Sequence, residues 1–307
     1  MKKSYLLIVL LFSSYLLSAN EYQAKTIQVD NTTRNYVIKY PDNYQKGHKL
    51  PLLIALHGGG STWKKFTNGT TKKTIQKQAN MNGYLLILPE GKNNHWNDGR
   101  NKNIAESDRY NDIKFISLLI DKSISEYLVD ADKIFITGMS NGGFMAIRLA
   151  IELSDKLKAV SAVAAQMSYA NKNLVSKEPI SFLLINGTDD PVVPFNGGEM
   201  KLFKFSKSRG YIMSTAKTIE YFVKNSQCSN SVKTSFQNKR KFDKTTVTSK
   251  SYQECFGQSQ VKLVQINGGG HTWPGGKQYL PEKIIGIRSR EINASKLMLD
   301  FFNQVSQ

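Results

Sequence analysis

The sequence predicts an α/β fold, in which a mostly parallel central sheet follows an N-terminal antiparallel pair of strands and carries helices on both faces. Three observations predict it. Apolar and polar side chains alternate near the N-terminus, which is typical of half-buried antiparallel strands. Further along, several short apolar runs are unbroken, as expected for central strands that are covered on both sides. The stretches between these runs have helical periodicity, and strands that alternate with helices favour a parallel sheet.

The elements follow one another along the chain. Alternating apolar residues in 27–29 and 36–40 predict the antiparallel pair, with a turn over 30–33. Unbroken apolar runs predict central strands over 52–56, 84–88, 134–136, 160–165, 182–185 and 261–266. Apolar positions on one face predict helices over 112–128, 143–153, 215–226 and 290–305. The polar stretch 229–250 is expected to be a loop or an excursion from the fold. Because no repeat or long linker interrupts the pattern, residues 20–307 are expected to form a single domain.

Composition excludes several classes of protein. The chain has 307 residues, of which 40% are apolar and 10% aromatic; this content can fill a sizeable core and argues against disorder. Two cysteines are too few for a disulfide scaffold or a four-thiolate zinc site. The formal charge of +18 is compatible with binding to nucleic acid, to an anionic membrane surface or to an acidic substrate, or with a solubilising surface.

Residues 1–19 are typical of a secretory signal peptide. Lys2 and Lys3 precede a largely apolar run over 5–17, and small residues follow it. The run is shorter than the roughly 20 residues that span a bilayer, so no stable membrane insertion is expected once 1–19 is removed. The remaining chain would carry 40 basic and 24 acidic residues, a charge of +16. We therefore expect a secreted or periplasmic protein without a nucleic-acid partner.

The sharpest motif is G-x-S-x-G at 138–142, between the apolar run 134–136 and a helix-forming stretch. A sharp strand-to-helix turn would expose the hydroxyl of Ser140 at the carboxyl edge of the sheet, and the flanking glycines permit its strained backbone. The helix that follows would direct its free amides to the place where negative charge develops. The motif predicts a nucleophilic serine; taken alone, it also fits an ordinary glycine-rich turn.

A second glycine-rich motif, H-G-G-G at 57–60, follows the strand predicted over 52–56. Such loops supply backbone amides to an oxyanion hole, and a tetrahedral intermediate needs two of these donors. We expect the backbone amides of Gly59 and Asn141 to be these two donors. The His57 ring is expected to brace the loop, with the substrate pocket as a second possible place for it. A phosphate-binding loop is the alternative, but the GKS/T sequence is absent.

His271 is the best candidate for a general base. Of the four histidines, it is the one that follows a long apolar strand late in the chain, in a glycine-rich loop. Serine hydrolases built on a parallel sheet place their base there, in the chain order serine, acid, histidine. The acid is therefore expected between Ser140 and His271, where Asp189 and Asp190 follow the apolar run 182–185 and both fit. Its role would be to fix the tautomer of the imidazole.

Cys228 and Cys255 are 27 positions apart and are the only thiols. In an exported chain a disulfide between them is the economical interpretation, with two buried free thiols as the alternative. Closing a loop of this size contributes about 3–4 kcal/mol in the chain-entropy model. No spacing typical of a catalytic metal site is present, so neither a metal nor another cofactor is expected.

Together these motifs resemble a group of secreted α/β-hydrolases that contains poly(3-hydroxybutyrate) depolymerases and feruloyl esterases. The matching stretches extend over most of the chain in family order: LHGGGST at 56–62, NDIKFI at 111–116, ITGMSNGGFMA at 136–146, NGTDDPVVPFNGG at 186–198 and INGGGHTWPGG at 266–276. The resemblance implies an α/β-hydrolase fold, and the two cysteines resemble the bridge of the family.

The resemblance also implies roles for particular residues. The acid of the family stands four positions before a proline, which selects Asp190 because Pro194 follows it at that distance. The histidine that leads this pattern in the family is Asn186 here. Trp273 matches the aromatic residue beside the catalytic histidine of the family and is a candidate for the substrate pocket. Trp96, in a polar loop, is a further pocket candidate.

We therefore expect a secreted serine esterase in which 20–307 form the catalytic domain and an acyl group passes through Ser140 to water. Its partner is an ester, small or polymeric, of the polyhydroxybutyrate, feruloyl, acetyl or small soluble type. One alternative is a peptidase or amide hydrolase on the same scaffold. Another is a non-catalytic module that binds an envelope polymer. The sequence leaves the class of ester and the oligomeric state open.

Overall fold

The computed structural model describes residues 21–100, 110–201 and 207–307, and the predicted signal peptide, 1–19, lies outside them. Most of its strands belong to one large sheet, with these bounds: β1 Gln23–Val29, β2 Thr32–Lys39, β3 Leu50–Leu56, β4 Leu85–Pro89, β5 Val129–Met139, β6 Ala159–Val163, β7 Ser181–Gly187, β10 Val232–Gln237, β11 Thr246–Tyr252 and β12 Val261–Asn267. Two further strands, β8 Gly198–Glu199 and β9 Tyr211–Ile212, pair with each other.

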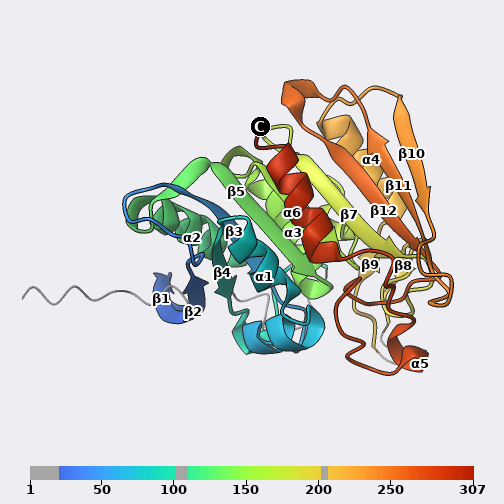
Figure 1. Cartoon of the computed structure of the whole chain (residues 1–307), viewed down its shortest axis with the longest axis horizontal. Helices are drawn as coiled ribbons and strands as arrows, with labels where there is room; N and C mark the ends of the chain where they lie inside the picture. Colours follow the sequence, from blue (N-terminus) through green and yellow to red (C-terminus); the bar gives the residue numbers. More distant parts are fainter. Residues whose placement is uncertain (1–20, 101–109, 202–206) are drawn as a thin grey trace, which may run out of the picture.

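The large sheet is parallel at its centre and antiparallel at both ends. Its order is β1-β2-β4-β3-β5-β6-β7-β12-β11-β10. The strands from β4 to β12 in this order are parallel to one another, whereas β1, β2, β11 and β10 run antiparallel to their neighbours. In Figure 1 the N-terminal pair lies at one end of the sheet and β10 at the other. The predicted fold class is confirmed.

Helices cover both faces of this sheet. Their bounds are α1 Thr74–Met81, α2 Asp112–Glu126, α3 Asn141–Glu152, α4 Thr215–Asn225, α5 Glu282–Ile285 and α6 Ala294–Gln304. The predicted helices correspond to α2, α3, α4 and α6. Three of them begin where a side chain accepts a hydrogen bond from the amide three residues on: Asn111 before α2, Ser214 before α4 and Asn293 before α6.

The sheet separates two hydrophobic cores. One contains α2, α3 and α4, and the other contains α1 and α6, which lie in front of the strands in Figure 1. Because successive side chains of a strand point to opposite faces, Leu52 and Ile54 of β3 pack in the first core and Leu53 and Ala55 in the second. Burial on both faces explains why the central strands have unbroken apolar sequences.

The prediction of a loop over 229–250 is wrong, because β10 and much of β11 lie there and extend the sheet. Backbone pairing of β10 with β11, and of β11 with β12, holds these strands more than apolar burial does, since Val232 and Phe236 of β10 are exposed. Val247 of β11 is the exception and faces the second core. A polar edge strand of this kind lacks the apolar pattern from which strands are predicted. The N-terminal turn is also shorter than predicted, because β2 already begins at Thr32.

A disulfide joins Cys228, just after α4, to Cys255, just after β11. It closes a loop of 27 residues that contains the β10–β11 hairpin. The bridge therefore fastens the antiparallel end of the sheet to a helix of the first core, and the predicted pairing is confirmed.

Replacing both cysteines with serine should lower the free energy of unfolding by about 3–4 kcal/mol, because the unfolded chain regains the entropy of an open loop. Thermal denaturation followed by circular dichroism should show a midpoint roughly 6–12 °C lower. The wild-type protein with its disulfide reduced is the control and should behave like the double variant. An unchanged midpoint in both samples would contradict this account.

Candidate active site

Ser140 occupies the sharp turn between β5 and α3. Its backbone has φ 54° and ψ −124°, a strained conformation for a residue with a side chain, and it is half-buried. Its amide donates to the carbonyl oxygen of Val163 at the end of β6. Since α3 begins at Asn141, the first amides of the helix have no acceptor within the helix and point toward this turn.

The glycines of G-x-S-x-G are required by close backbone packing. A Cβ on Gly138 would lie 2.2 Å from the carbonyl oxygen of Gly142. A Cβ on Gly142 would lie 2.4 Å from the carbonyl oxygens of both Leu56 and His57. The first turn of α3 thus lies directly against the ends of β5 and β3: a side chain at Gly138 would separate it from β5, and one at Gly142 from β3.

The glycine-rich loop after β3 lies beside Ser140 and Asn141. A Cβ on Gly58 would be 3.7 Å from the Cβ of Ser140, and a Cβ on Gly59 would be 3.4 Å from the Cβ of Asn141. The His95 ring also lies next to Gly59. The structure therefore brings together the two residues whose amides are expected to form an oxyanion hole.

His57 is fully buried and braces this loop. Its Nδ1 hydrogen-bonds with the carbonyl oxygen of Gly58 at 2.8 Å, so this nitrogen carries the proton. Its Nε2 accepts from the amide of Gly91 at 3.0 Å and lies 3.3 Å from a carboxylate oxygen of Glu90. The ring has no exposed surface, so the prediction of His57 as a residue of the substrate pocket is wrong and the bracing role fits.

Asp190 and His271 form a hydrogen-bonded pair. Asp190 Oδ2 lies 2.7 Å from His271 Nδ1, and both side chains are buried. The other carboxylate oxygen, Oδ1, accepts from the amides of Val192 and Val193 at 2.8 and 2.7 Å. These bonds fix the carboxylate in one orientation. Asp189, by contrast, is exposed, and its carboxylate accepts from the neighbouring hydroxyl of Thr188.

The loops that carry Asp190 and His271 are held together by backbone contacts at the ends of β7 and β12. The amide of Asp189 donates to the carbonyl oxygen of Gly269 at 2.9 Å, and a Cβ on Gly187 would lie 2.2 Å from that same oxygen. The amide of Thr188 donates to the carbonyl oxygen of Ile266. Parallel pairing of β7 with β12 thus determines where Asp190 and His271 lie.

Ser140 belongs to the same edge of the sheet, because β5, β6, β7 and β12 are consecutive in the sheet order. Among hydrogen bonds between described residues, none joins its hydroxyl to the His271 ring. Catalytic hydrogen bonds are often long before substrate binds and tighten in the complex. The structure therefore places these three residues on one edge and pairs two of them.

Tyr279 supports the His271 loop. Its hydroxyl donates to the carbonyl oxygen of His271 at 2.9 Å. Burial, and to a smaller degree the Asp190 carboxylate, raises the pKa of Tyr279 well above its usual value. The hydroxyl therefore remains a donor at any pH near neutrality.

Both tryptophans predicted to line the substrate pocket are buried, so these two predictions are wrong. Trp273 has no exposed surface; its Nε1 donates to Ser295 Oγ, and its ring meets the edge of Phe66. Trp96 is 1% exposed, and its Nε1 donates to the carbonyl oxygen of His57. An aromatic side chain next to a catalytic residue in sequence can equally point into the core, and the sequence does not distinguish these directions.

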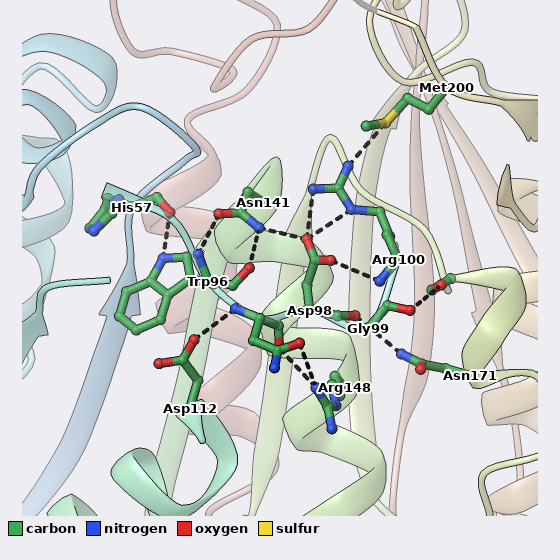
Figure 2. A network of polar contacts seen from close by, with 12 residues as sticks. His57, Trp96, Asp98, Gly99, Arg100, Asp112, Asn141, Arg148, Asn171 and Met200 are labelled. Atoms are coloured by element: carbon green, nitrogen blue, oxygen red, sulfur yellow. Dashed lines mark hydrogen bonds and ion pairs between the residues drawn. The ribbon is translucent and has the colours of Figure 1, made fainter. Parts of the chain in front are cut away.

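A buried polar network fixes the side chain of Asn141, as Figure 2 shows. Asn141 Oδ1 accepts from the amide of Trp96 at 2.8 Å, and its Nδ2 donates to the carbonyl oxygen of Trp96 at 3.0 Å and to Asp98 Oδ2 at 2.6 Å. Asp98 in turn pairs with the guanidinium of Arg100 at 2.6 Å. Arg100 lies over the Phe144 ring and donates to the sulfur of Met200. The residue next to the serine is thus fixed by three hydrogen bonds.

The same loop is attached to α2 and α3 through Asn97. The Asn97 amide donates to Asp112 Oδ2 at 2.7 Å, and its carbonyl oxygen accepts from Arg148 of α3. Asp112 also pairs with Arg34 at 2.7 Å. Burial raises the pKa of Asp112, although the Arg34 guanidinium acts in the opposite direction. Sequence reasoning missed Asp98 and these partners, because a charged residue in a polar loop gives no sign that it is buried.

Asn186, which replaces a histidine of the family pattern, is buried between β6 and α4. Its Oδ1 accepts from the amide of Ala165, and its Nδ2 donates to the carbonyl oxygen of Ala165 and to Thr215 Oγ1. It therefore supports the loop after β6 and does not touch the Asp190 carboxylate.

Within the described ranges, no group of three or more His, Cys, Asp or Glu side chains could hold a metal ion. None of the described helices is long and apolar enough to cross a membrane.

Asp98→Asn should destabilise the protein by about 3 kcal/mol, because the Arg100 guanidinium would remain buried without a carboxylate. Urea denaturation followed by tryptophan fluorescence measures this change. Asp155→Asn is the control, since Asp155 pairs with Lys177 at the exposed surface, and its effect should be small. Equal stability of the Asp98 variant and wild type would show that this network does not hold the loop.

Comparison with known proteins agrees with this arrangement. NocK of Nocardia uniformis subsp. tsuyamanensis, which is named as an esterase, is 27% identical over 259 residues, covering 82% of this chain and 73% of NocK. A protein of Aspergillus clavatus named as a feruloyl esterase C is 30% identical over 180 residues, covering 58% of this chain. The chain spans 62% of the length of that relative.

Among solved structures, the acetyl xylan esterase from Aspergillus awamori has a similar fold, with a TM-score of 0.60 at 15% identity. The match covers 92% of this chain and 99% of that enzyme. The sequence pattern of the phospholipase/carboxylesterase family matches residues 43–233. That range holds the serine turn, the glycine-rich loop and Asp190, and the chain belongs to the phospholipase/carboxylesterase family of α/β-hydrolases.

Proposed function

We propose that this protein is a secreted serine esterase that hydrolyses carboxylic esters through an acyl-enzyme on Ser140. A signal peptide over 1–19 would direct export, and 20–307 would form one catalytic domain. The observation that carries the proposal is the hydrogen bond between Asp190 and His271, on the sheet edge where the strained Ser140 turn also lies. Membership of a family of esterases supports it.

The proposed reaction has two acyl-transfer steps. Ser140 Oγ attacks the ester carbonyl while His271 Nε2 takes its proton, and the imidazolium then gives this proton to the departing alcohol. Water attacks the acyl-enzyme in the second step, again with His271 as base, and releases the carboxylic acid. Asp190 accepts from His271 Nδ1 throughout, which keeps Nε2 free for the proton and stabilises the imidazolium.

The negative charge of each tetrahedral intermediate would be stabilised by the amides of Gly59 and Asn141. Three features support this role: the proximity of the two residues, the position of Asn141 at the start of α3, and the hydrogen bonds that fix its side chain. Donors fixed in advance need no reorganisation when charge develops, and such stabilisation is often the largest contribution to catalysis. No cofactor takes part in this chemistry.

The names of the relatives favour a class of substrate. One is named as a feruloyl esterase, and the enzyme with a similar fold is an acetyl xylan esterase. We therefore favour feruloyl or acetyl esters over the polyhydroxybutyrate-type esters that the sequence also allows.

Ser140→Ala should reduce hydrolysis of p-nitrophenyl acetate by at least about a thousandfold, since the nucleophile is lost. A fluorophosphonate probe should label wild type and not the variant. Absence of labelling in folded wild type would favour a non-catalytic binding module. Faster turnover of a matched p-nitroanilide than of the ester would favour an amide hydrolase.

Asp190→Asn should reduce kcat by about 10³–10⁴-fold, because an amide in this place favours the wrong tautomer of His271. Asp189→Asn provides the matched control, since the Asp189 carboxylate is exposed and accepts a hydrogen bond from the adjacent Thr188 hydroxyl, and its rate should remain close to wild type. The reverse ranking of the two variants would assign the acid to Asp189.

A further inference from the structure

We propose that a basic cavity beside the His271 loop binds the carboxylate groups of an anionic polysaccharide, and that the ester cleaved at Ser140 is carried by such a polymer. This inference rests on the proposed esterase function and adds the class of substrate. The cavity has a volume of about 710 Å³ and is lined by Arg240, Phe242, Asp243, Lys244, Gln278, Glu282, Ile287, Arg288 and Arg290. None of these residues belongs to the proposed catalytic set.

The cavity lies at the carboxyl edge of the sheet, where the catalytic residues also gather. Thr246, the first residue of β11, pairs with Asn267, the last residue of β12. The tip of the β10–β11 hairpin, 238–245, therefore lies where β12 ends and the His271 loop begins. In Figure 1 this tip is on the same side of the sheet as α5.

Backbone contacts connect the cavity wall to His271. A Cβ on Gly268 would lie 2.8 Å from the carbonyl oxygen of Lys244 in the hairpin tip. The amide of Gly270 donates to the carbonyl oxygen of Ile287, and that of His271 to the carbonyl oxygen of Ile285. A polymer in the cavity would thus lie against the segment that carries the proposed base, so a neighbouring unit could extend toward Ser140.

The cavity has an excess of positive charge. Four basic side chains and two acidic ones line it. Among described residues, no carboxylate forms an ion pair with Arg240, Lys244, Arg288 or Arg290. These cations are therefore available to a ligand.

The two acidic side chains offset these positive charges only in part. Asp243 Oδ1 accepts from the amide and the hydroxyl of Thr245, and its Oδ2 accepts from the amide of Arg290. Both oxygens of this carboxylate therefore accept hydrogen bonds from Thr245 and from the Arg290 backbone, and neither is paired with a basic side chain of the described residues. Glu282 is exposed. When both acids are counted, the lining of the cavity still has a net charge of +2.

The backbone that carries Arg240 and the side chain of Arg288 are held in place by hydrogen bonds within the protein. The buried carboxylate of Glu291 accepts from the amides of Lys239 and Arg240, which fastens the hairpin tip. The guanidinium of Arg288 donates to the carbonyl oxygen of Gly276. Burial, followed by the nearby charge of Arg290, lowers the pKa of Arg288, although Asp243 acts in the opposite direction; an anion in the cavity would add to the effect of Asp243.

The chemistry of the lining favours carboxylated sugars. Guanidinium groups bind carboxylates through paired hydrogen bonds. Several cations around one large cavity suit a ligand with repeated charges. Phe242 is completely exposed beside them, and an exposed aromatic ring suits the apolar face of a sugar ring, which a chain of phosphates lacks. A polyuronate fits all three features.

Binding of de-esterified polygalacturonate to the full mature protein, measured by biolayer interferometry, tests this proposal. Arg240→Glu combined with Arg290→Glu should weaken binding at least about tenfold, because two attractions become repulsions. Lys233→Glu combined with Lys250→Glu is the matched control: it makes the same change of charge in the same hairpin, at the opposite end of its strands. This control should bind like wild type, and binding by wild type should weaken with added salt.

Phe242→Ala should weaken polygalacturonate binding about threefold or more, given the usual contribution of an aromatic contact. Equal losses in both double variants would overturn the proposal, because they would indicate diffuse surface charge. Tight binding of inorganic polyphosphate or of neutral dextran, unaffected by Phe242→Ala, would also overturn it. Circular dichroism of each variant establishes that it is folded.

A second measurement separates this inference from the esterase function. The ratio of kcat/KM on acetylated polygalacturonate to that on p-nitrophenyl acetate should fall about tenfold in Arg240→Glu/Arg290→Glu, following its loss of binding. If the protein binds the polymer through the cavity but hydrolyses no ester, the proposed esterase function is refuted and the binding site is supported. Hydrolysis with an unchanged ratio would refute the link between the cavity and the substrate.

Discussion

The candidate site depends on one constraint, the close backbone approach between the first turn of α3 and the end of β3. Without side chains at Gly138 and Gly142, the helix can begin in contact with the carbonyl oxygens of Leu56 and His57. That contact leaves Ser140 little choice of conformation, and a strained residue of this kind costs of order 1–3 kcal/mol. Packing of the central strands and of α3, which are almost wholly buried, offsets this strain. The position of the serine is thus a property of the packed core, and the glycine-rich loop after β3 is brought beside it by the same contact.

Buried ion pairs, in addition to close backbone packing, fix the loop beside Asn141. The pairs Asp98–Arg100 and Asp112–Arg34 lie on either side of Asn97, and each must lose its hydration when the chain folds. Such pairs contribute little net stability, but they tolerate few alternative arrangements, because an unpaired buried charge is very unfavourable. Here they specify one position for the loop that holds the Asn141 side chain. A loop held only by apolar contacts could slide along α3, whereas directional bonds to Asn141 cannot be satisfied elsewhere.

The sequence predicted those elements whose residue pattern is found in one kind of structure. Unbroken apolar runs predicted the central strands, and the candidate residues that follow these runs, Ser140, the Asp189–Asp190 pair and His271, lie at one edge of the sheet in the structure. Between the two aspartates, sequence physics could not decide, because the choice depends on the turn that directs the amides of Val192 and Val193 to one carboxylate. The edge strand β10 was missed because its pairing uses backbone groups, and Asp98 was missed because its partners lie 2 to 43 positions away. The family resemblance selected Asp190, the residue that pairs with His271.

The burial of several acidic residues affects how the high positive charge of the chain is distributed. Asp98 and Asp112 are buried with arginine partners, so each pair is neutral, whereas Asp190 and Glu291 are buried against amides and an imidazole. Among the described residues, the last two carboxylates have no lysine or arginine of their own in the interior, so the exposed side chains alone carry more positive charge than the net charge of the chain implies. Both also act at the carboxyl edge, where Asp190 orients His271 and Glu291 fixes the hairpin tip that carries Arg240. Burial of these carboxylates at the edge that holds Ser140 and His271 thus leaves basic side chains in excess around the neighbouring cavity, and this excess is the physical basis of the proposed binding of an anionic polymer.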